Sequence, residues 1–183
     1  MTRIKVLSIC CLTIMLFARL QCAKDLPEDN NHHQKIMFVN NTEHELYLFM
    51  SYNPDMFVEK SLDFKVVLHQ GGINKVSPFE TNGRVLSMMD SYWETVFERE
   101  KEFNSDTLWL YVLDAYKLEV EKNYGFDAAL ECYGLTLADL RKVNWKLTYP
   151  PTEEMKEIKM FPSFEEVIRK SKETDTEDNS QNQ

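Results

Sequence analysis

Glycine, cysteine and catalytic motifs are all scarce in this chain of 183 residues. It has five glycines, and none of them forms a glycine-rich phosphate loop or a Gly-x-Ser-x-Gly elbow. The His-Glu-x-x-His pattern of zinc proteases and Cys-x-x-Cys pairs are missing as well. These absences exclude the enzyme classes that a motif can reveal. The sequence therefore predicts no catalytic residue, no cofactor and no metal site.

Positive charge is also in short supply. The chain has 21 Lys and Arg against 30 Asp and Glu, a formal net charge of −9. Proteins that bind nucleic acid gain much of their affinity by neutralising phosphates, so this balance argues against a nucleic-acid partner. We expect a protein, peptide or glycan partner instead, and membrane contact only through a lipid anchor.

Residues 1–23 are predicted to form a signal peptide. Arg3 and Lys5 precede the apolar run Val6–Ala18, which has the length of a signal-peptide core and is too short to span a bilayer. We therefore expect an exported protein of the periplasm, the outer membrane or the extracellular space.

Two fates are open for the mature N-terminus. In the first, Cys22 is the lipidation candidate and ties the protein to a membrane. Cys132 then has no intramolecular partner and is expected to be a small buried residue. In the second, the leader is cleaved near Ala23 and the protein is simply secreted, and a Cys22–Cys132 disulfide can form if Cys22 survives cleavage.

One globular domain is predicted, with a polar segment before it and another after it. Residues 24–34 are predicted to be a polar tether, in which His32 and His33 are solvated rather than metal ligands. Residues 35–170 are long enough for a single globular domain with a sizeable core. Residues 171–183 are acidic and nearly devoid of hydrophobic side chains, so we expect a disordered tail.

The chain is organised around the segment that begins at Asp106. Leu108–Leu113 is apolar and aromatic on both faces, which predicts an interior strand. Thr136 and Asp139 form a capping-box pattern that predicts a short helix. The alternation from Trp145 to Tyr149 then predicts a half-buried strand, ended by two prolines.

This segment resembles the signature of a family of small secreted proteins and lipoproteins of the Bacteroidetes, whose function is uncharacterised. Three strings carry the resemblance: Asp-Thr-Leu before an apolar strand, Tyr-Gly-Leu-Thr-Leu-Ala-Asp-Leu, and Asn-Trp-Lys-Leu-Thr-Tyr-Pro-Pro. Gly134, Ala138 and Lys146 depart from the family pattern. The resemblance is strongest over residues 106–162. It implies an envelope or extracytoplasmic protein and transfers no activity.

The Asp-Thr-Leu string has a second implication. Asp106-Thr107 followed by an apolar residue resembles the O-glycosylation acceptor of secreted proteins of the same phylum, which makes Thr107 a glycosylation candidate. The same residues open the predicted central strand, so a structural role is the alternative.

The other elements follow from shorter patterns. The expected strands are Ile36–Val39, Leu46–Tyr52, Ile73–Phe79 and Arg84–Met88. The pattern over Met56–Gly72 is ambiguous, and Phe64–Leu68 is a candidate strand within it. Asn40–Glu43 should turn the first strand back into the second, and Asn82-Gly83 favours a hairpin. Besides the short helix at Thr136, the expected helices are Ser91–Phe103, Tyr116–Asn123, Phe126–Tyr133, Thr152–Met160, and one that starts at Ser163.

These elements predict an α+β fold, with an antiparallel, sandwich-like sheet of five to seven strands covered by a few helices. For function, we expect a non-enzymatic binding domain, which should expose an aromatic or apolar patch. The alternative is a carboxylate-dependent hydrolase, which should gather two or more carboxylates within ~5–10 Å of each other in a cleft. Asp114, at the end of the central strand, is the best single functional carboxylate, and a helix cap is its other role.

Overall fold

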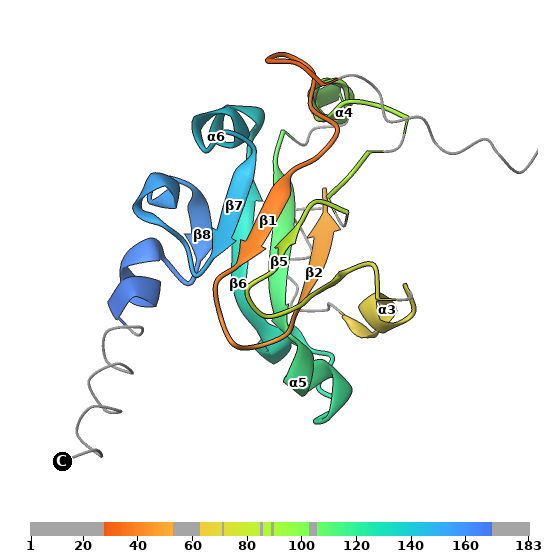
Figure 1. Cartoon of the computed structure of the whole chain (residues 1–183), viewed down its shortest axis with the longest axis vertical. Helices are drawn as coiled ribbons and strands as arrows, with labels where there is room; N and C mark the ends of the chain where they lie inside the picture. The colour runs from red at the N-terminus through yellow and green to blue at the C-terminus, as the bar shows by residue number, and fades with distance from the viewer. Residues whose placement is uncertain are drawn as a thin grey trace, which may run out of the picture.

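The computed structural model describes residues 28–52, 63–70, 72–84, 86–88, 90–102 and 106–169. Two facing sheets and several short helices form one mixed α+β body, as predicted (Figure 1). The smaller sheet has the order β4 (Thr81–Asn82), β1 (Met37–Asn40), β7 (Lys146–Tyr149). The larger sheet has the order β3 (Lys75–Val76), β2 (Leu46–Ser51), β5 (Leu108–Asp114), β6 (Ala129–Leu135), β8 (Lys159–Phe161). All described pairs are antiparallel except β1 with β7.

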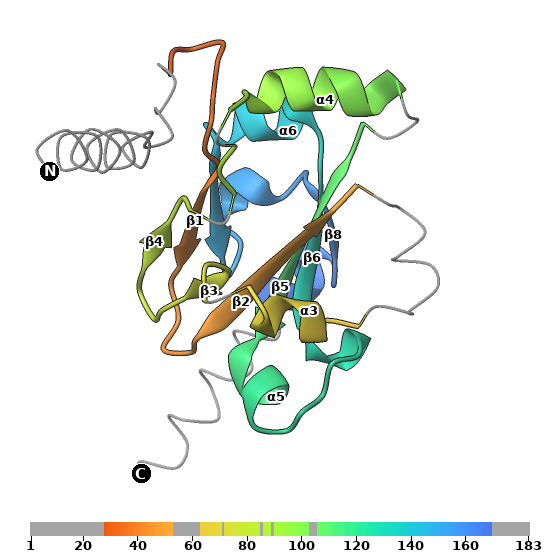
Figure 2. The ribbon, with the colours of Figure 1, turned by 90° about the vertical axis from the view of Figure 1, so that its right-hand side faces the viewer.

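Helices close the two ends of the sheets. The α-helices are α3 (Lys65–Leu68), α4 (Trp93–Glu102), α5 (Ala115–Glu119) and α6 (Leu137–Lys142), and residues 164–169 are helical too. Short 3₁₀ turns are η1 (Phe126–Ala128) and η2 (Glu153–Met155). In Figure 2, α4 and α6 lie at one end of the molecule and α5 at the opposite end. Among the described residues, no helix is long and apolar enough to cross a membrane.

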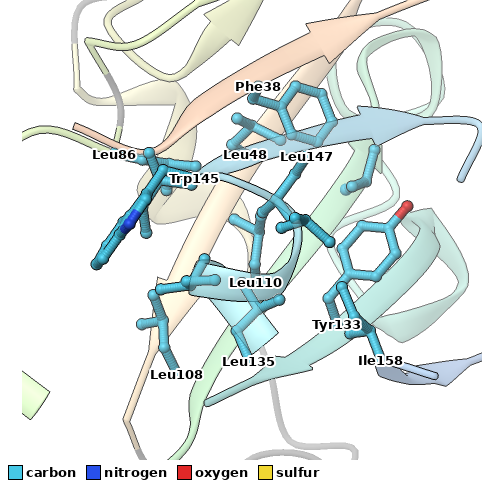
Figure 3. Packing of buried hydrophobic residues seen from close by; sticks show 14 of the residues in the cluster. Phe38, Leu48, Leu86, Leu108, Leu110, Tyr133, Leu135, Trp145, Leu147 and Ile158 are labelled. Carbon is cyan, nitrogen blue, oxygen red and sulfur yellow. The ribbon is translucent and has the colours of Figure 1, made fainter. Parts of the chain in front are cut away.

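One face of β5 forms the main core with the smaller sheet. Leu108, Leu110 and Val112 point to this side and are fully buried, together with Phe38 of β1 and Leu147 of β7 (Figure 3). Each such side chain contributes roughly 1.5–3 kcal/mol through its removal from water. This burial holds the two sheets face to face.

The opposite face of β5 packs on the helices. A second buried cluster lies on this side. It includes Trp109, Tyr111 and Leu113 of β5, together with Val67 of α3 and Leu118 of α5. Because β5 is covered on both sides, its sequence shows no polar face, which confirms the predicted interior strand.

The prediction of a helix over Phe126–Tyr133 is wrong for most of its length. Ala129–Leu135 is strand β6, which pairs with β5 on one side and with β8 on the other. Ala, Leu and Glu favour helices, but pairing between two strands outweighs that preference here. The helix predicted over Thr152–Met160 shrinks to one 3₁₀ turn for a similar reason, because its last residues become β8.

The two predicted hairpins are also wrong. β1 and β2 are consecutive in sequence but belong to different sheets. Asn40 still turns the chain, since its Oδ1 accepts hydrogen bonds from the N–H and hydroxyl of Thr42. Asn82 lies in β4 opposite Phe38 and not in a hairpin turn.

The candidate strand at Phe64–Leu68 is also wrong, because this region contains helix α3.

The capping box predicted at the start of the helix after β6 is confirmed. Thr136 and Asp139 form a reciprocal capping box at the start of α6. The N–H of Trp145 donates to the carbonyl of Leu140 at 2.8 Å and closes the other end of that helix. The chain then passes directly into β7, so this predicted helix and strand both stand.

Candidate functional site

The end of β5 leads directly into helix α5. Asp114 caps this helix, because its Oδ1 accepts hydrogen bonds from the N–H groups of Tyr116 at 2.8 Å and Lys117 at 3.3 Å. This is the structural role considered for Asp114 from the sequence. The cap fixes the direction of α5 and therefore the surface that α5 presents.

A pocket of about 250 Å³ lies between α5 and the turn that joins β1 to β2. We call it the α5 pocket. It is lined by Glu43, His44, Glu45, Asp114, Ala115, Tyr116, Glu119 and Val120. Half of these residues carry carboxylates, so the pocket favours a positively charged ligand group over an anionic one.

Lys75 of β3 holds two of these carboxylates in place. Its Nζ lies 2.7 Å from Glu45 Oε2 and 3.0 Å from Glu119 Oε1. The same nitrogen lies 5.7 Å from the centre of the Tyr47 ring, within the range of a cation–π contact. Tyr47 in turn donates its hydroxyl to Glu119 Oε1 at 2.6 Å. The network ties β2, β3 and α5 together at the pocket wall.

This network changes two pKa values in opposite directions. The hydrogen bond from Tyr47, followed by the one from Lys75, lowers the pKa of Glu119 below its ordinary value of 4.5. Burial, followed by the hydrogen bond to Glu119, raises the pKa of Tyr47 to about 12. At neutral pH, Glu119 is therefore an anion and Tyr47 is a neutral donor.

Apolar side chains stand exposed around the α5 pocket. Tyr116 is 61% exposed and Val120 is 59% exposed. Phe79 lies on the turn between β3 and β4 and is 68% exposed. Its backbone N–H donates to the carbonyl of Thr42, which places it beside the turn between β1 and β2. We call the α5 pocket together with Phe79 the α5 surface. It combines acidic side chains with the exposed side chains of Phe79, Tyr116 and Val120.

Phe79 is held in an unusual backbone conformation. Its φ of 56° lies in the left-handed region, which normally favours glycine at this position of a turn. The turn is closed by the N–H of Glu80, which donates to the carbonyl of Ser77 at 3.2 Å. Strained positions of this kind are often found at ligand clamps and other functional sites.

A second pocket of about 250 Å³ lies at the edge of β6. We call it the β6 pocket. It is lined by Lys117, Phe126, Ala129, Leu130, Glu131, Cys132, Phe161 and Pro162. Helix α5 contributes to both pockets, through Lys117 here and through Tyr116 and Glu119 in the α5 pocket.

Glu131 is the unusual residue of the β6 pocket. It is only 3% exposed, and its Oε2 accepts a hydrogen bond from the hydroxyl of Tyr133, which is itself fully buried. Burial raises the pKa of Glu131 from 4.5 to about 7, although the Tyr133 hydroxyl opposes this shift. Near neutral pH this carboxyl group is poised between its two protonation states.

The N-terminal segment differs from the predicted tether. His33 stacks on Trp145 with ring centres 4.1 Å apart, and its Nδ1 lies 2.7 Å from Glu94 Oε1. Gln34 is 2% exposed. The prediction of a solvated segment is therefore wrong for these two residues. Within the part of the chain that the structure describes, no cluster of His, Cys, Asp and Glu could hold a metal ion.

The modification candidates are only partly visible. Cys22 and the predicted signal peptide lie outside the described residues, as does the tail 171–183. The Thr107 hydroxyl donates to Asp106 Oδ1 at 3.0 Å, just before β5, and its glycosylation stays a prediction. Cys132 is free and 1% exposed, and burial raises the pKa of its thiol to about 12.

The sequence did not single out Lys75, Phe79 or Glu131. Lys75 gains its position from the pairing of β3 with β2, and Phe79 gains its position from the turn that follows β3. No local sequence pattern marks either residue. Glu131 does carry a signal, because it is the one acid between apolar neighbours in Ala-Ala-Leu-Glu-Cys-Tyr.

The comparisons with known proteins add no identification. No protein-family model matches the sequence, no curated protein matches it, and no solved structure matches the fold.

Proposed function

We propose that this chain is an exported, non-enzymatic binding domain whose α5 surface recognises a cationic segment of a protein or peptide. The observation that carries this proposal is the acidic α5 pocket, in which Tyr116 and Val120 are exposed, with Phe79 exposed on the turn between β3 and β4. Carboxylates attract lysine or arginine, and exposed aromatic residues supply contact area at low entropic cost. Because Lys75 already orders the pocket wall, little conformational entropy is lost on binding.

The hydrolase alternative is less well supported. A carboxylate-dependent hydrolase needs an acid of raised pKa close to a second carboxylate. Glu131 has the raised pKa, but the residues that line its pocket include no second carboxylate. Glu119 has several acidic neighbours, but its own pKa is lowered. The two requirements are therefore met in different pockets.

A peptide titration tests the binding function. The probes are a fluorescent peptide of alternating lysine and leucine and a matched peptide with glutamate in place of lysine. We expect fluorescence anisotropy to show that the lysine peptide binds and the glutamate peptide does not. Added salt should weaken binding, because the Debye length shrinks from about 10 Å at 0.1 M to about 3 Å at 1 M ionic strength.

Matched variants separate recognition from the overall negative charge. Glu43→Gln lies in the α5 pocket, whereas Glu154→Gln removes the same charge from an exposed site in η2. Glu43→Gln and Tyr116→Ala should each weaken the lysine peptide several-fold, and Glu154→Gln should leave it nearly unchanged. Equal losses in Glu43→Gln and Glu154→Gln would show attraction by net charge alone and would reject the proposed site.

The exported location is part of the same proposal and rests on the predicted signal peptide and the resemblance to Bacteroidetes envelope proteins. It is tested by the intact mass and membrane partitioning of the chain expressed in a Bacteroidetes host, beside a Cys22→Ala variant. A lipid-sized mass increment and membrane binding that both disappear on substitution would establish a lipoprotein. A soluble protein that begins near Ala23 in both cases would establish simple secretion, and an unprocessed cytoplasmic chain would contradict export.

A further inference from the structure

The side chain of Glu131 points into the space between the two sheets. Side chains alternate between the two faces of a strand, so Glu131 shares a face of β6 with Tyr133. Tyr133 belongs to the buried cluster between the sheets (Figure 3), as does Val112, the β5 partner of Glu131. Cys132 belongs to the cluster on the opposite face. The carboxyl group of Glu131 therefore lies in the main core, on the side of β6 that faces the smaller sheet.

The hydroxyl of Tyr133 has one proton and two acceptors. It donates to Glu131 Oε2, and it lies 3.4 Å from the carbonyl oxygen of Thr148 in β7. Burial, followed by the charge of Glu131, raises the pKa of Tyr133 above its ordinary value of 10, so the hydroxyl keeps its proton at neutral pH. One O–H group cannot fully serve both acceptors. Tyr133 therefore joins the larger sheet to the smaller one only when its proton is directed at Thr148.

The carbonyl of Thr148 depends on this donor. β7 is an edge strand of the smaller sheet. The carbonyl of Tyr149 accepts from the N–H of Asn41 on the β1 side, so the alternate carbonyl of Thr148 points away from β1. The N–H of Thr148 donates to Met155 Sδ at 3.4 Å. Among the described residues, Tyr133 is the donor that reaches the Thr148 carbonyl, and a buried carbonyl without a donor is costly.

The protonation state of Glu131 decides where the proton of Tyr133 goes. A protonated carboxyl group has an O–H that can donate to the Tyr133 oxygen, which leaves the Tyr133 proton free for Thr148. An ionised carboxylate only accepts, and its charge makes it the stronger acceptor. It therefore draws the Tyr133 proton to itself, and the Thr148 carbonyl loses its donor.

Glu131 is the group of this cluster that titrates near neutral pH. Burial raises its pKa to about 7, whereas burial raises the pKa of the Cys132 thiol to about 12 and that of the Tyr149 hydroxyl further still. The cluster is otherwise uncharged, and among the described residues no cation contributes to the pKa of Glu131. The charged side chains of the neighbouring elements are Asp114 of β5, Lys117 of α5, Lys146 of β7 and Lys159 of β8.

Three of these four charged side chains have other contacts. Asp114 caps α5, and Lys117 donates its Nζ to the carbonyl of Asp127 at 2.7 Å. Lys159 Nζ lies 5.0 Å from the centre of the Trp109 ring. Lys146, the fourth, is exposed. A change of charge at Glu131 is therefore felt first by Tyr133.

We propose that Glu131, Tyr133 and Thr148 form a proton-dependent switch between the two sheets. When Glu131 takes up a proton from solvent, a hydrogen-bond chain runs from its carboxyl group through Tyr133 to Thr148 and joins β6 to β7. When Glu131 releases the proton, the bond from Tyr133 to Thr148 is lost and the sheets are held less tightly at this point. This switch is separate from the α5 surface and does not depend on the cationic partner proposed for that surface.

A pH titration of the ¹³C-labelled full chain tests the switch. The backbone carbonyl carbon of Thr148 and the side-chain carboxyl carbon of Glu131 are followed by NMR from about pH 5 to pH 9, a range centred on the pKa of Glu131. We expect the Thr148 carbon to move upfield as the pH rises, because its carbonyl loses a hydrogen bond, with the same midpoint as the Glu131 carboxyl. A Thr148 carbon that does not move, or that moves with a different midpoint, would overturn the proposal.

Tyr133→Phe separates the hydrogen bond from the electric field of the carboxylate. This variant keeps the buried ring and removes the hydroxyl. The Thr148 carbon should then no longer titrate, while Glu131 should still titrate, at higher pH, because the hydroxyl that lowers its pKa is gone. Tyr47→Phe removes a hydroxyl that donates to Glu119 instead, and it should leave the Thr148 titration unchanged. A Thr148 titration that persists in Tyr133→Phe would be a field effect and would reject the switch.

Glu131→Gln fixes the switch in one state. The side-chain amide cannot ionise, and its N–H can donate to the Tyr133 oxygen as the protonated carboxyl group does. The Thr148 carbon should keep its low-pH position throughout the titration, and a carbon that still moves would contradict the proposal. The lysine–leucine peptide should bind Tyr133→Phe and Glu131→Gln normally, so the α5 surface is judged separately.

Discussion

Glu119 and Glu131 lie in the two pockets to which α5 contributes, and the fold treats their charges in opposite ways. Glu119 receives hydrogen bonds from Tyr47 and Lys75, and its pKa is lowered. Glu131 receives one from Tyr133 and, among the described residues, none from a cation, and burial raises its pKa to about 7. Both carboxylates accept a hydrogen bond from a tyrosine hydroxyl. The difference between their pKa values therefore comes from the ion pair of Glu119 with Lys75 and from the deeper burial of Glu131. A compensated carboxylate stabilises the fold, whereas an uncompensated one costs stability and marks a site with another use.

The largest effect is expected for Glu131→Gln. The pKa of Glu131 is about 7 in the folded protein and 4.5 ordinarily, so folding favours its protonated form. The ionised carboxylate lowers the free energy of unfolding. This loss is absent below pH 4.5, grows between pH 4.5 and 7, and is complete above pH 7. At 1.36 kcal/mol per unit this is about 3 kcal/mol at pH 8. Glu131→Gln should raise the free energy of unfolding by about that amount at pH 8 and hardly at all at pH 4.

Urea denaturation at both pH values measures this difference. The neighbouring Tyr133 and Tyr149 do not interfere, because burial raises the pKa of both hydroxyls above their ordinary value of 10. A Glu131→Gln variant that is no more stable than the original chain at pH 8 would contradict the idea of an uncompensated charge.

The same substitution at Glu119 should have the opposite sign and a smaller size. The side-chain amide introduced by Glu119→Gln would keep the hydrogen bond from Tyr47, but the ion pair with Lys75 would be lost. Because the Glu119 side chain is 37% exposed, we expect a loss of about 1 kcal/mol at pH 7. The lowered pKa makes this stabilisation present above pH 4.5, and it disappears as the pH falls through the lowered value.

Denaturation of Glu119→Gln at pH 7 and pH 3 provides the check. Lys75→Met and the double variant complete a thermodynamic cycle that isolates the ion pair. A gain in stability at pH 7, or a coupling energy of zero, would show that the lysine does not compensate Glu119.

The smallest effect is expected at Phe79. Glycine accepts a φ of 56° without strain, so Phe79→Gly should raise the free energy of unfolding by about 0.5 kcal/mol even though glycine is more flexible when unfolded. The same variant should bind the lysine–leucine peptide several-fold more weakly. Tyr116→Ala is the matched control, because it removes an exposed aromatic side chain without relieving strain.

Thermal unfolding of Phe79→Gly and Tyr116→Ala measures the change in stability, and fluorescence anisotropy measures the binding of the lysine–leucine peptide to each variant. If Phe79→Gly destabilises the protein, Phe79 supports the turn. If it leaves peptide binding unchanged, Phe79 does not belong to the α5 surface.

Local patterns predicted the parts of this fold that depend on local chemistry. The capping box at Thr136 and the strands at Leu108–Leu113 and Trp145–Tyr149 are confirmed, because caps and unbroken or alternating hydrophobicity act over a few residues. The element at Ala129–Leu135 was missed, because its pairing with β5 and β8 involves distant residues. The same error hid Glu131.

The candidate site was predicted even less completely. Asp114 was found because it ends an apolar strand, and its role as a cap is local. Lys75 reaches Glu119 across 44 positions of sequence, and no short pattern can show such a contact. The acidic charge balance and the missing catalytic motifs led to the hypothesis of a binding domain in general, whereas the α5 surface could be proposed only from the fold.

The most direct test of the contrast between the two glutamates is a pH titration of their side-chain carboxyl carbons by ¹³C NMR, assigned with the Glu119→Gln and Glu131→Gln variants. We predict that Glu131 titrates near pH 7 and Glu119 below pH 4.5. If both titrate together near pH 4.5, the fold does not distinguish them, and Glu131 is not an uncompensated buried carboxylate.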